Sequence, residues 1–295
     1  MGNLSTIRAD IERDIRRNGA KAITGDILQA RLLDIVGYLE DQEARKEYLT
    51  FEAAEDNVNV YFHAPDGNDN ADLKVSVDGG VTWQQIHATQ GADSGRGSLV
   101  ATLAHAGDKV LLKTAEDGRA MGYYSEDEGE AIGPDLNVDG RCYVYGNVMS
   151  LLYEDFSNRN SVPAYALPCL FSDYCGEIDN AGLLSHPAKR LLLPATTLAQ
   201  YCYNYMFSGC TGLTTAPELP ATTLAQYCYN FMFTGCTGLG RIKAMFLTTP
   251  STTYTASWVS NVKSTGVFIK NSAATWDVTG NNGIPAGWTV QTASA

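Results

Sequence analysis

A 26-residue internal repeat constrains this 295-residue chain more than any other feature. Residues 193–204 return without change at residues 219–230, and the match continues through the Met-Phe and Gly-Cys-Thr-Gly-Leu segments that follow each copy. A unit of this length cannot bury its apolar side alone, so copies at a fixed period stack on one another. The repeat therefore predicts a solenoid, which presents a surface and seldom encloses a catalytic cleft.

Changes in periodicity divide the chain into four expected regions. Apolar residues at helical spacing predict a helical anchor or oligomerisation segment at 1–50. Short strands are predicted at 58–62, 73–77, 99–103 and 109–113, between segments rich in Gly, Asp and Asn, and they indicate an antiparallel β-domain at 51–146. The solenoid is expected at 147–250 and a β-rich C-terminal cap at 251–295. The cap contains Trp258, Trp276 and Trp288, which we expect to cover the open end of the stack. The alternative is that Trp276 and Trp288 are exposed and bind sugars.

The N-terminal region has two apolar stripes. The second begins after Thr24, a plausible helix cap, and its spacing of four, three and four is a short heptad seam. So few layers cannot sustain a solitary coiled coil, but they suit a segment that trimerises or docks on a larger assembly. The alternative is that the stripe packs on the next domain. The predicted anchor and oligomerisation residues are Ile7, Ile11, Ile15, Leu28, Leu32, Ile35 and Leu39.

The net charge of −12 is concentrated in the middle of the chain. Residues 51–190 contain 22 acidic and 9 basic side chains, whereas residues 191–295 contain 2 and 4. No basic stripe is present that would neutralise phosphates, so we expect no nucleic-acid partner. No apolar run reaches about 18 residues, so we expect no membrane insertion. The N-terminus lacks the basic and apolar blocks of a signal peptide, which favours folding in a cytoplasm.

Four of the seven cysteines recur at equivalent repeat positions, as the pairs 202/228 and 210/236. Stacked coils would bring each pair close enough for a disulfide in principle. We favour the simpler interpretation that these thiols are small buried apolar groups. Zinc binding is less favoured, because Cys-x7-Cys is not a chelating spacing and no histidine is near.

Motifs that would indicate metal binding or catalysis are weak. Residues 76–83 match a single Asp-box, which stabilises a hairpin and is not itself catalytic. The acidic runs at 66–72 and 135–146 depart from the EF-hand pattern and are better explained as polar turns. The four histidines have no recognisable spacing, and no nucleophile or phosphate-loop motif is present. We therefore expect no metal, no cofactor and no enzymatic activity.

Residues 202–213 and 228–239 resemble the leucine-rich repeats of BspA-like bacterial surface proteins. The form with Leu-Pro-Ala-Thr-Thr-Leu-Ala is similar to that in gut Bacteroides proteins and in the crAss-like bacteriophages that infect these bacteria. Residues 18–29 are similar to the leading segment of phage fibre proteins. The resemblance implies a mixed α and β, multidomain fold: an N-terminal helical anchor, a small antiparallel β-domain, a short leucine-rich-repeat solenoid and a β-rich C-terminal cap.

The resemblance also implies a function and its partners. We expect a virion structural protein, a head or tail fibre or decoration subunit that forms a homotrimer, contacts capsid or tail proteins and displays its repeats for host attachment. The alternative is a secreted or surface-anchored bacterial adhesin, located on the bacterial cell surface instead of the virion, with oxidised repeat cysteines. In either case the exposed face of the coils would contact a host glycan or protein. The predicted host-binding residues are Thr196, Thr197, Gln200, Thr222, Thr223 and Gln226.

Overall fold

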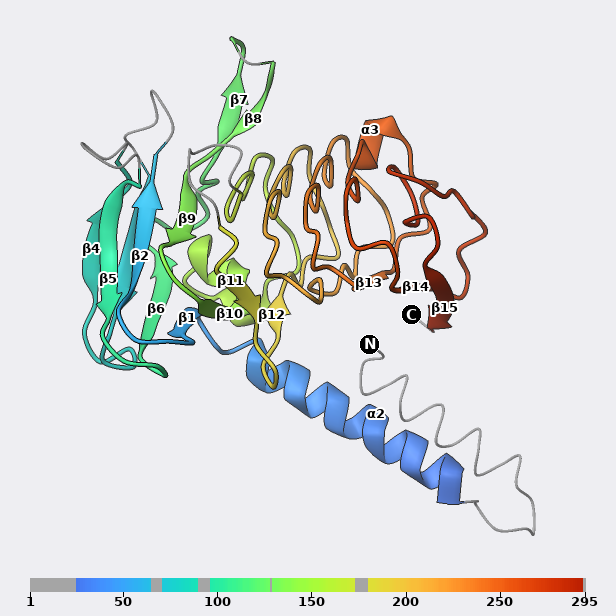
Figure 1. Cartoon of the computed structure of the whole chain (residues 1–295), viewed down its shortest axis with the longest axis horizontal. Helices are drawn as coiled ribbons and strands as arrows, with labels where there is room; N and C mark the ends of the chain where they lie inside the picture. Colours follow the sequence, from blue (N-terminus) through green and yellow to red (C-terminus); the bar gives the residue numbers. More distant parts are fainter. Residues whose placement is uncertain (1–24, 65–70, 90–95, 128, 173–179, 294–295) are drawn as a thin grey trace.

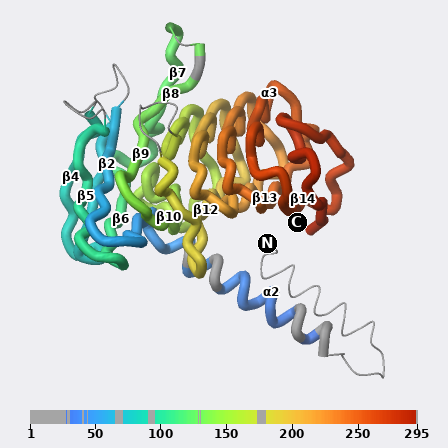
Figure 2. The backbone as a smooth tube through the Cα atoms, in the orientation of Figure 1, coloured from blue at the N-terminus to red at the C-terminus, as the bar shows by residue number. Residues whose placement is uncertain are grey.

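An elongated body and one projecting helix make up the protein. The computed structural model describes residues 25–64, 71–89, 96–127, 129–172 and 180–293. Helix α2 (Gly25–Ala44) extends away from the body, in which small sheets at one end pass into a row of stacked coils at the other (Figure 1). The chain advances along the body in sequence order, as the continuous change of colour in Figure 2 shows. Ile7, Ile11 and Ile15 lie outside the described residues.

Mostly antiparallel strands form the first part of the body, although β11 and β12 pair in parallel with β10. Its largest sheet has the order β11-β10-β1-β6-β3-β4, with β12 also paired to β10, and β5-β2-β9 form a second sheet. β7 and β8 form a separate two-stranded hairpin. The four strands expected from the alternating runs 58–62, 73–77, 99–103 and 109–113 are all present, within one residue at each end. The strands are β1 (Leu49–Ala53), β2 (Val58–His63), β3 (Asp72–Ser76), β4 (Gln84–His87), β5 (Ser98–Leu103), β6 (Lys109–Thr114), β7 (Tyr123–Ser125), β8 (Glu130–Ile132), β9 (Asp135–Val138), β10 (Cys142–Asn147), β11 (Leu183–Ser185) and β12 (Leu191–Leu192).

Side-chain alternation explains why these strands form the core. Val58, Val60 and Phe62 of β2 are fully buried, whereas the residues between them are partly exposed. Two short 3₁₀-helices, η1 (Val148–Leu151) and η2 (Phe156–Asn158), follow β10 and lead the chain into the coils. Asn147 caps η1, because its side chain accepts a hydrogen bond from the backbone N–H of Met149.

The repeat copies stack directly on one another. The backbone N–H of Tyr203 donates to the carbonyl of Cys228 (3.1 Å), and the same pairing recurs at every second residue along this turn. Inside the stack, Phe207 lies between two phenylalanine rings at centroid distances of 5.2 and 5.5 Å, and Tyr203 stacks on Tyr229 at 6.2 Å. All these rings are buried. Equivalent side chains one period apart therefore form continuous apolar ladders.

The predicted fold class is wrong. Strands make up 31% of the structure and helices 10%, the sheets are several and small, and α2 and α3 are the two α-helices of the described chain. The repeats do not form a closed leucine-rich-repeat solenoid behind a helical anchor. The physical reason lies in the backbone: Tyr201, Tyr205 and Gly209 all have positive φ values, of 55°, 55° and 77°. A left-handed residue at every fourth position interrupts both helix and strand, so these segments are successive turns.

A small parallel sheet and a set of aromatic residues form the C-terminal end. β13 (Arg241–Ala244), β14 (Val267–Asn271) and β15 (Thr289–Ala293) pair side by side, and α3 (Thr252–Thr255) is a single helical turn. Trp258, Trp276 and Trp288 are all at least 93% buried. Trp258 stacks on Tyr229 of the last repeat copy, at 6.3 Å. Because Trp276 and Trp288 are buried, the alternative that they bind sugars at the surface is wrong.

The repeat cysteines are buried and form no disulfide, in agreement with the interpretation favoured from the sequence. Cys202, Cys210, Cys228 and Cys236 have no exposed surface, and none of them is oxidised. The Sγ atom of Cys210 donates to the carbonyl of Phe171, and the Sγ atom of Cys236 donates to the carbonyl of Phe207. Of the other described cysteines, Cys142 is free and Cys169 is disulfide-bonded.

Candidate functional site

The predicted host-binding residues form two equivalent sets on the surface of the stack. Thr196, Thr197 and Gln200 are exposed in the first copy. Thr222, Thr223 and Gln226 are exposed at the same places in the second copy. Because the copies stack in register, the two sets lie along one edge of the body. The structure therefore brings these six residues together in space, across 30 residues of sequence.

A row of tyrosines that the sequence analysis did not single out runs beside this edge. Tyr165, Tyr201 and Tyr227 are half-buried, with ring centroids 5.6 and 4.7 Å apart from one to the next. Tyr124 of β7 reaches the row from the hairpin and lies 5.8 Å from Tyr201. The side-chain amide of Gln200 donates to the hydroxyl of Tyr165, which joins the row to the threonine and glutamine edge. We call these four tyrosines the tyrosine row.

The sequence did contain a signal for the tyrosine row. Aromatic residues recur at 201, 203, 205 and 207, and an alternating pattern of this kind suggests a strand with one face buried. The turns instead repeat every four residues, so Tyr203 and Phe207 point into the core and Tyr201 lies at the surface. The pattern was visible, but its period could be assigned only from the backbone.

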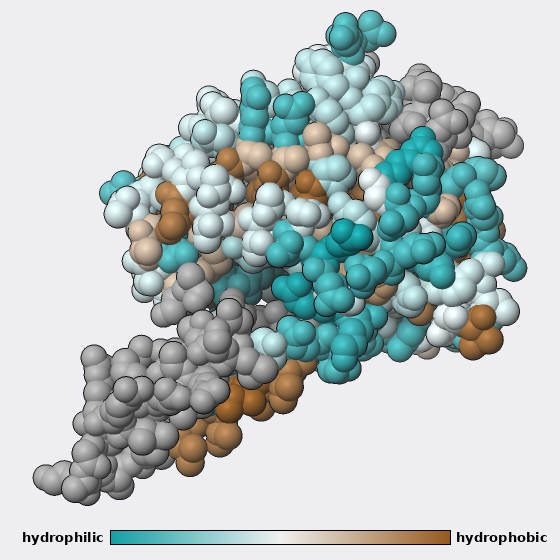
Figure 3. Space-filling model, turned by 180° about the vertical axis from the view of Figure 1, so that it is seen from behind, coloured by the Kyte–Doolittle hydropathy of each residue, from teal (hydrophilic) through white to brown (hydrophobic). Residues whose placement is uncertain are grey.

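The predicted anchor residues that the structure describes lie on α2 and are largely exposed. Leu28, Leu32 and Leu39 keep about half of their surface exposed, and Ile35 is partly exposed. Leu33 and Val36 are also exposed apolar residues of α2, and the heptad pattern missed them. In Figure 3 apolar side chains lie along one side of this helix. In the single chain this stripe is therefore not packed on the next domain, and the alternative prediction is wrong.

A cleft of about 820 Å³ lies on the other side of the body, between the loop joining β11 to β12 and the coil turns that precede and include β13. Figure 1 places β12 and β13 along the lower side, with β12 near the C-terminal end of α2, and α3 along the upper side. The tyrosine row is next to α3, because the N–H of Tyr227 donates to the carbonyl of Thr253. The ionisable residues that line the cleft are His186, Lys189, Arg190, Glu218, Arg241 and Lys243.

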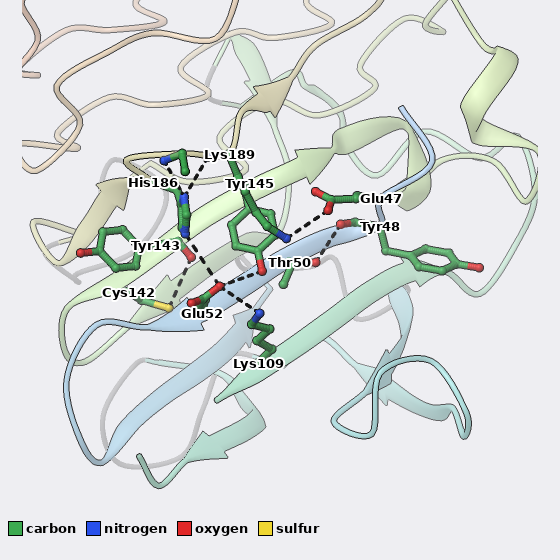
Figure 4. Close-up of polar contacts among 11 residues, drawn as sticks. Glu47, Tyr48, Thr50, Glu52, Lys109, Cys142, Tyr143, Tyr145, His186 and Lys189 are labelled. Atoms are coloured by element: carbon green, nitrogen blue, oxygen red, sulfur yellow. Dashed lines mark hydrogen bonds and ion pairs between the residues drawn. The ribbon is translucent and has the colours of Figure 1, made fainter. Parts of the chain in front are cut away.

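A polar network on β1 and β10 supports one wall of the cleft (Figure 4). The hydroxyl of Tyr145 donates to Glu52 Oε2 (2.8 Å), and Lys109 Nζ lies 3.4 Å from the same oxygen. His186 Nε2 lies 3.9 Å from that oxygen. His186 Nδ1 accepts hydrogen bonds from the backbone N–H groups of residues 188 and 189 (3.0 and 2.9 Å). These bonds hold the imidazole ring in one orientation at the edge of the cleft.

Lys189 is held in place by the same part of the sheet. Its Nζ atom lies 3.0 Å from Glu47 Oε1 and 4.2 Å from the ring centroid of Tyr145. An ammonium group above an aromatic face gains electrostatic stabilisation from the ring. On the opposite wall Lys243 pairs with Glu218 at 2.8 Å. Burial acts to raise the pKa of Glu218, whereas the positive charge of Lys243 and its hydrogen bond act to lower it, and the net result is a pKa below the usual value.

Two potential nucleophiles of this region, Tyr145 and Cys142, have raised pKa values. Burial, and then the hydrogen bond to Glu52, raises the pKa of Tyr145 far above its usual value. Burial raises the pKa of Cys142 to about 12. A nucleophile is activated by a lowered pKa or by an adjacent base, and these two groups are shifted the other way. The arrangement presents fixed positive charges and hydrogen-bond donors.

Two sequence expectations about metals and membranes can be compared with the described residues. Within the described ranges, no three His, Cys, Asp or Glu side chains converge so that they could hold a metal ion. Asp135, from one of the acidic runs, is buried and accepts a hydrogen bond from His63 Nδ1 (2.8 Å); residues 66–70 of the other run lie outside the described residues. None of the helices in the described part of the chain has both the length and the apolar character of a membrane span.

Comparisons of the chain with protein-family models, with curated proteins and with solved structures find no match.

Proposed function

We propose that this chain is a structural protein of a bacteriophage particle, a head or tail fibre or decoration subunit, and that its stacked coils attach to the host surface. The observation that carries the proposal is α2, a 20-residue helix that leaves the body with its apolar face exposed. An exposed apolar face of this size marks an interaction site. The resemblance of residues 18–29 to phage fibre proteins supports the same conclusion.

The partner of α2 is a second and a third copy of the same chain. Leu28, Leu32, Ile35 and Leu39 follow a heptad spacing, which packs helices around a common axis. A trimer would bury these side chains and leave each body held out from the bundle. This geometry is typical of a fibre subunit, with the helices directed toward capsid or tail proteins.

Mass measurement in solution tests the self-association. We expect a particle of about 96 kDa, three times 31.9 kDa, at micromolar concentration. Leu32→Gln should shift this mass toward the monomer, because it places an amide in the apolar seam. Leu99→Gln is the matched control, since Leu99 on β5 is 51% exposed and Leu32 is 52% exposed. A monomeric wild-type chain with residues 1–45 intact would overturn the trimer.

Electron microscopy of purified particles tests the location. We expect the chain at the head or the tail, with the coils outward. Finding it on the bacterial surface and not in particles would replace this proposal with the adhesin. The adhesin alternative also expects oxidised repeat cysteines, and none of the four forms a disulfide in the structure.

The tyrosine row and the threonine and glutamine edge form the surface that meets the host. Half-buried aromatic rings supply rigid apolar faces, and the neighbouring hydroxyl and amide groups supply hydrogen bonds, a combination that suits a glycan or a protein surface. Thr196→Glu with Thr222→Glu should abolish attachment to host cells. Both sites are exposed, so the free energy of unfolding should change by no more than about 0.5 kcal/mol.

A matched control for this surface exists in the same repeats. Thr211 and Thr237 are also exposed and also 26 residues apart, but they lie in the Gly-Cys-Thr turn away from the tyrosine row. Thr211→Glu with Thr237→Glu should leave attachment unchanged. Equal attachment by the two double variants would contradict this assignment of the surface.

A further inference from the structure

Charge in the C-terminal third of the chain is concentrated at the cleft. Residues 191–295 contain six charged side chains. Three of these, Glu218, Arg241 and Lys243, line the cleft, and the adjoining loop adds Lys189 and Arg190. Four cations therefore converge on one cavity in a protein with a net charge of −12. Charged residues that only keep a protein soluble would be spread over its surface, whereas these four line one cavity.

Strand geometry explains how two of the cations face the same way. Arg241 and Lys243 are two residues apart on β13, so their side chains leave the same face, while Ile242 and Ala244 between and after them are buried. A parallel bridge pairs Arg241 with Thr215 of the preceding coil, which aligns that coil with the strand. The backbone from which these two side chains extend is thus held in place by hydrogen bonds.

The positive charge is only partly balanced inside the protein. Glu47 pairs with Lys189, and Glu218 pairs with Lys243. Within the described part of the chain Arg241 is exposed and makes no ion pair. An arginine side chain in this setting offers a planar fork of N–H donors that matches a carboxylate.

The remaining lining of the cleft selects among anions. Thr214 and Thr215 expose hydroxyl groups at the rim, and Leu213, Pro217 and Leu192 supply apolar wall. A volume of about 820 Å³ lies within the range of small-ligand sites. The acidic segment 51–190, with a net charge of −13 from its 22 acidic and 9 basic side chains, repels polyanions such as nucleic acid. A short ligand that combines carboxylate groups with many hydroxyl groups satisfies all three features.

We propose that this cleft binds an acidic saccharide, with a uronic-type carboxylate held by Arg241 and Lys243 and the sugar hydroxyls held by the threonine rim. The site is separate from the tyrosine row and does not depend on the trimer. His186 and Lys189, held by the network of Figure 4, form the facing wall.

Calorimetric titration of the full chain with trigalacturonate tests the proposal. We expect saturable binding that weakens as salt is raised, and no binding of the neutral trisaccharide of galactose. Arg241→Gln should weaken the affinity about tenfold or more, the effect of one charge-assisted hydrogen bond. Lys263→Gln is the matched control, because Lys263 is an exposed cation of the same region that does not line the cleft. The affinity of this variant for trigalacturonate should equal that of the wild type.

Three results would overturn the proposal. Absence of trigalacturonate binding would remove the site, and equal weakening by Arg241→Gln and Lys263→Gln would show a diffuse charge effect. Equally tight binding of triglutamate would replace the saccharide with an acidic peptide. Both substitutions replace exposed residues. Thermal unfolding midpoints equal to that of the wild type establish that the variants remain folded.

Discussion

At the scale of single residues, two buried tyrosines illustrate opposite uses of a hydroxyl group. Tyr145 donates to Glu52, and its hydroxyl is part of the network that supports the cleft. Tyr203 is fully buried in the stack, and among the described residues its hydroxyl has no hydrogen-bond partner. A buried polar group without a partner loses its hydration and gains nothing in return. Tyr203 therefore contributes to stability through its ring alone, by stacking on Tyr229.

Removing these two hydroxyls should change stability in opposite directions. Tyr203→Phe should raise the free energy of unfolding by about 1 kcal/mol or more, because it deletes an unsatisfied buried group and keeps the ring. Tyr145→Phe should lower it by about 1 kcal/mol, because Glu52 loses a donor. Urea denaturation of both variants measures the two changes. Destabilisation by Tyr203→Phe would mean that its hydroxyl has a partner in solution.

At the scale of elements, the hairpin of β3 and β4 depends on a single carboxylate. The Asp-box, residues 76–83, forms the turn, and Asp78 accepts hydrogen bonds from the backbone N–H groups of Val81 and Thr82 and from the hydroxyls of Ser76 and Thr82. Gly79 and Gly80 have φ values of 75° and 92°, which other residues rarely adopt. Trp83 donates to the carbonyl of Gly80 and lies under Lys113, whose Nζ atom is 4.0 Å from the ring.

The hydrogen bonds to Asp78 determine how the hairpin responds to acid. The side-chain hydroxyl and then the backbone N–H of Thr82 are the largest causes that hold the pKa of Asp78 well below its usual value of 3.8. A carboxyl group with a lowered folded pKa stabilises the fold above its unfolded pKa, and this contribution is lost as the pH falls through the folded pKa. We expect the hairpin to persist below pH 3.8 and to loosen only at still lower pH.

A carboxyl-carbon NMR titration tests this expectation. The Asp78 signal should titrate below its position in the urea-unfolded chain, and Thr82→Val should raise the midpoint by removing one donor to the carboxylate. Val81→Ala is the control, because it keeps the backbone N–H that Asp78 accepts. A midpoint equal to that of the unfolded chain would contradict the hydrogen-bond assignment.

At the scale of the whole molecule, the stack has one continuous core from the sheets to the C-terminal tryptophans. Phe51 of β1 lies 6.1 Å from Phe171, and the row of rings then runs through Phe207 and Phe233 to Trp258. The four repeat cysteines lie inside this core, without exposed surface. Access to them therefore requires that the stack opens.

Thiol labelling of the native protein should report this opening. Burial raises the pKa of Cys228 to about 12 and that of Cys202 well above its usual value, so little thiolate exists at neutral pH. We expect Cys202, Cys210, Cys228 and Cys236 to react with an aromatic disulfide reagent only as fast as the stack unfolds, and at similar rates. Mass spectrometry after timed quenching measures each site. Rapid reaction of one cysteine in native buffer would show that its coil opens independently.

Local sequence patterns predicted the strands, in which side chains alternate between a buried and an exposed face. The alternating runs predicted β2, β3, β5 and β6, because alternation of buried and exposed side chains is a property of the strand itself. The exact 26-residue repeat predicted that copies stack, and the buried thiols followed from that stacking. The exposure of Thr196 and its equivalents could also be predicted from the sequence, because polar residues at repeat positions face outward when apolar ones face inward.

Only the tertiary structure decided how the repeats fold and which charged side chains, distant in the sequence, lie together. The repeat predicted a solenoid, and its resemblance to BspA-like proteins implied a leucine-rich-repeat form. The left-handed residues Tyr201 and Tyr205 instead make each coil a series of turns, and a backbone angle of this kind has no signature in a tyrosine. The cleft unites Lys189 with Arg241, 52 positions apart, through strand pairing that no short-range pattern encodes. Periodicity is a local property and appears in the sequence, whereas the meeting of distant side chains is set by register and stacking.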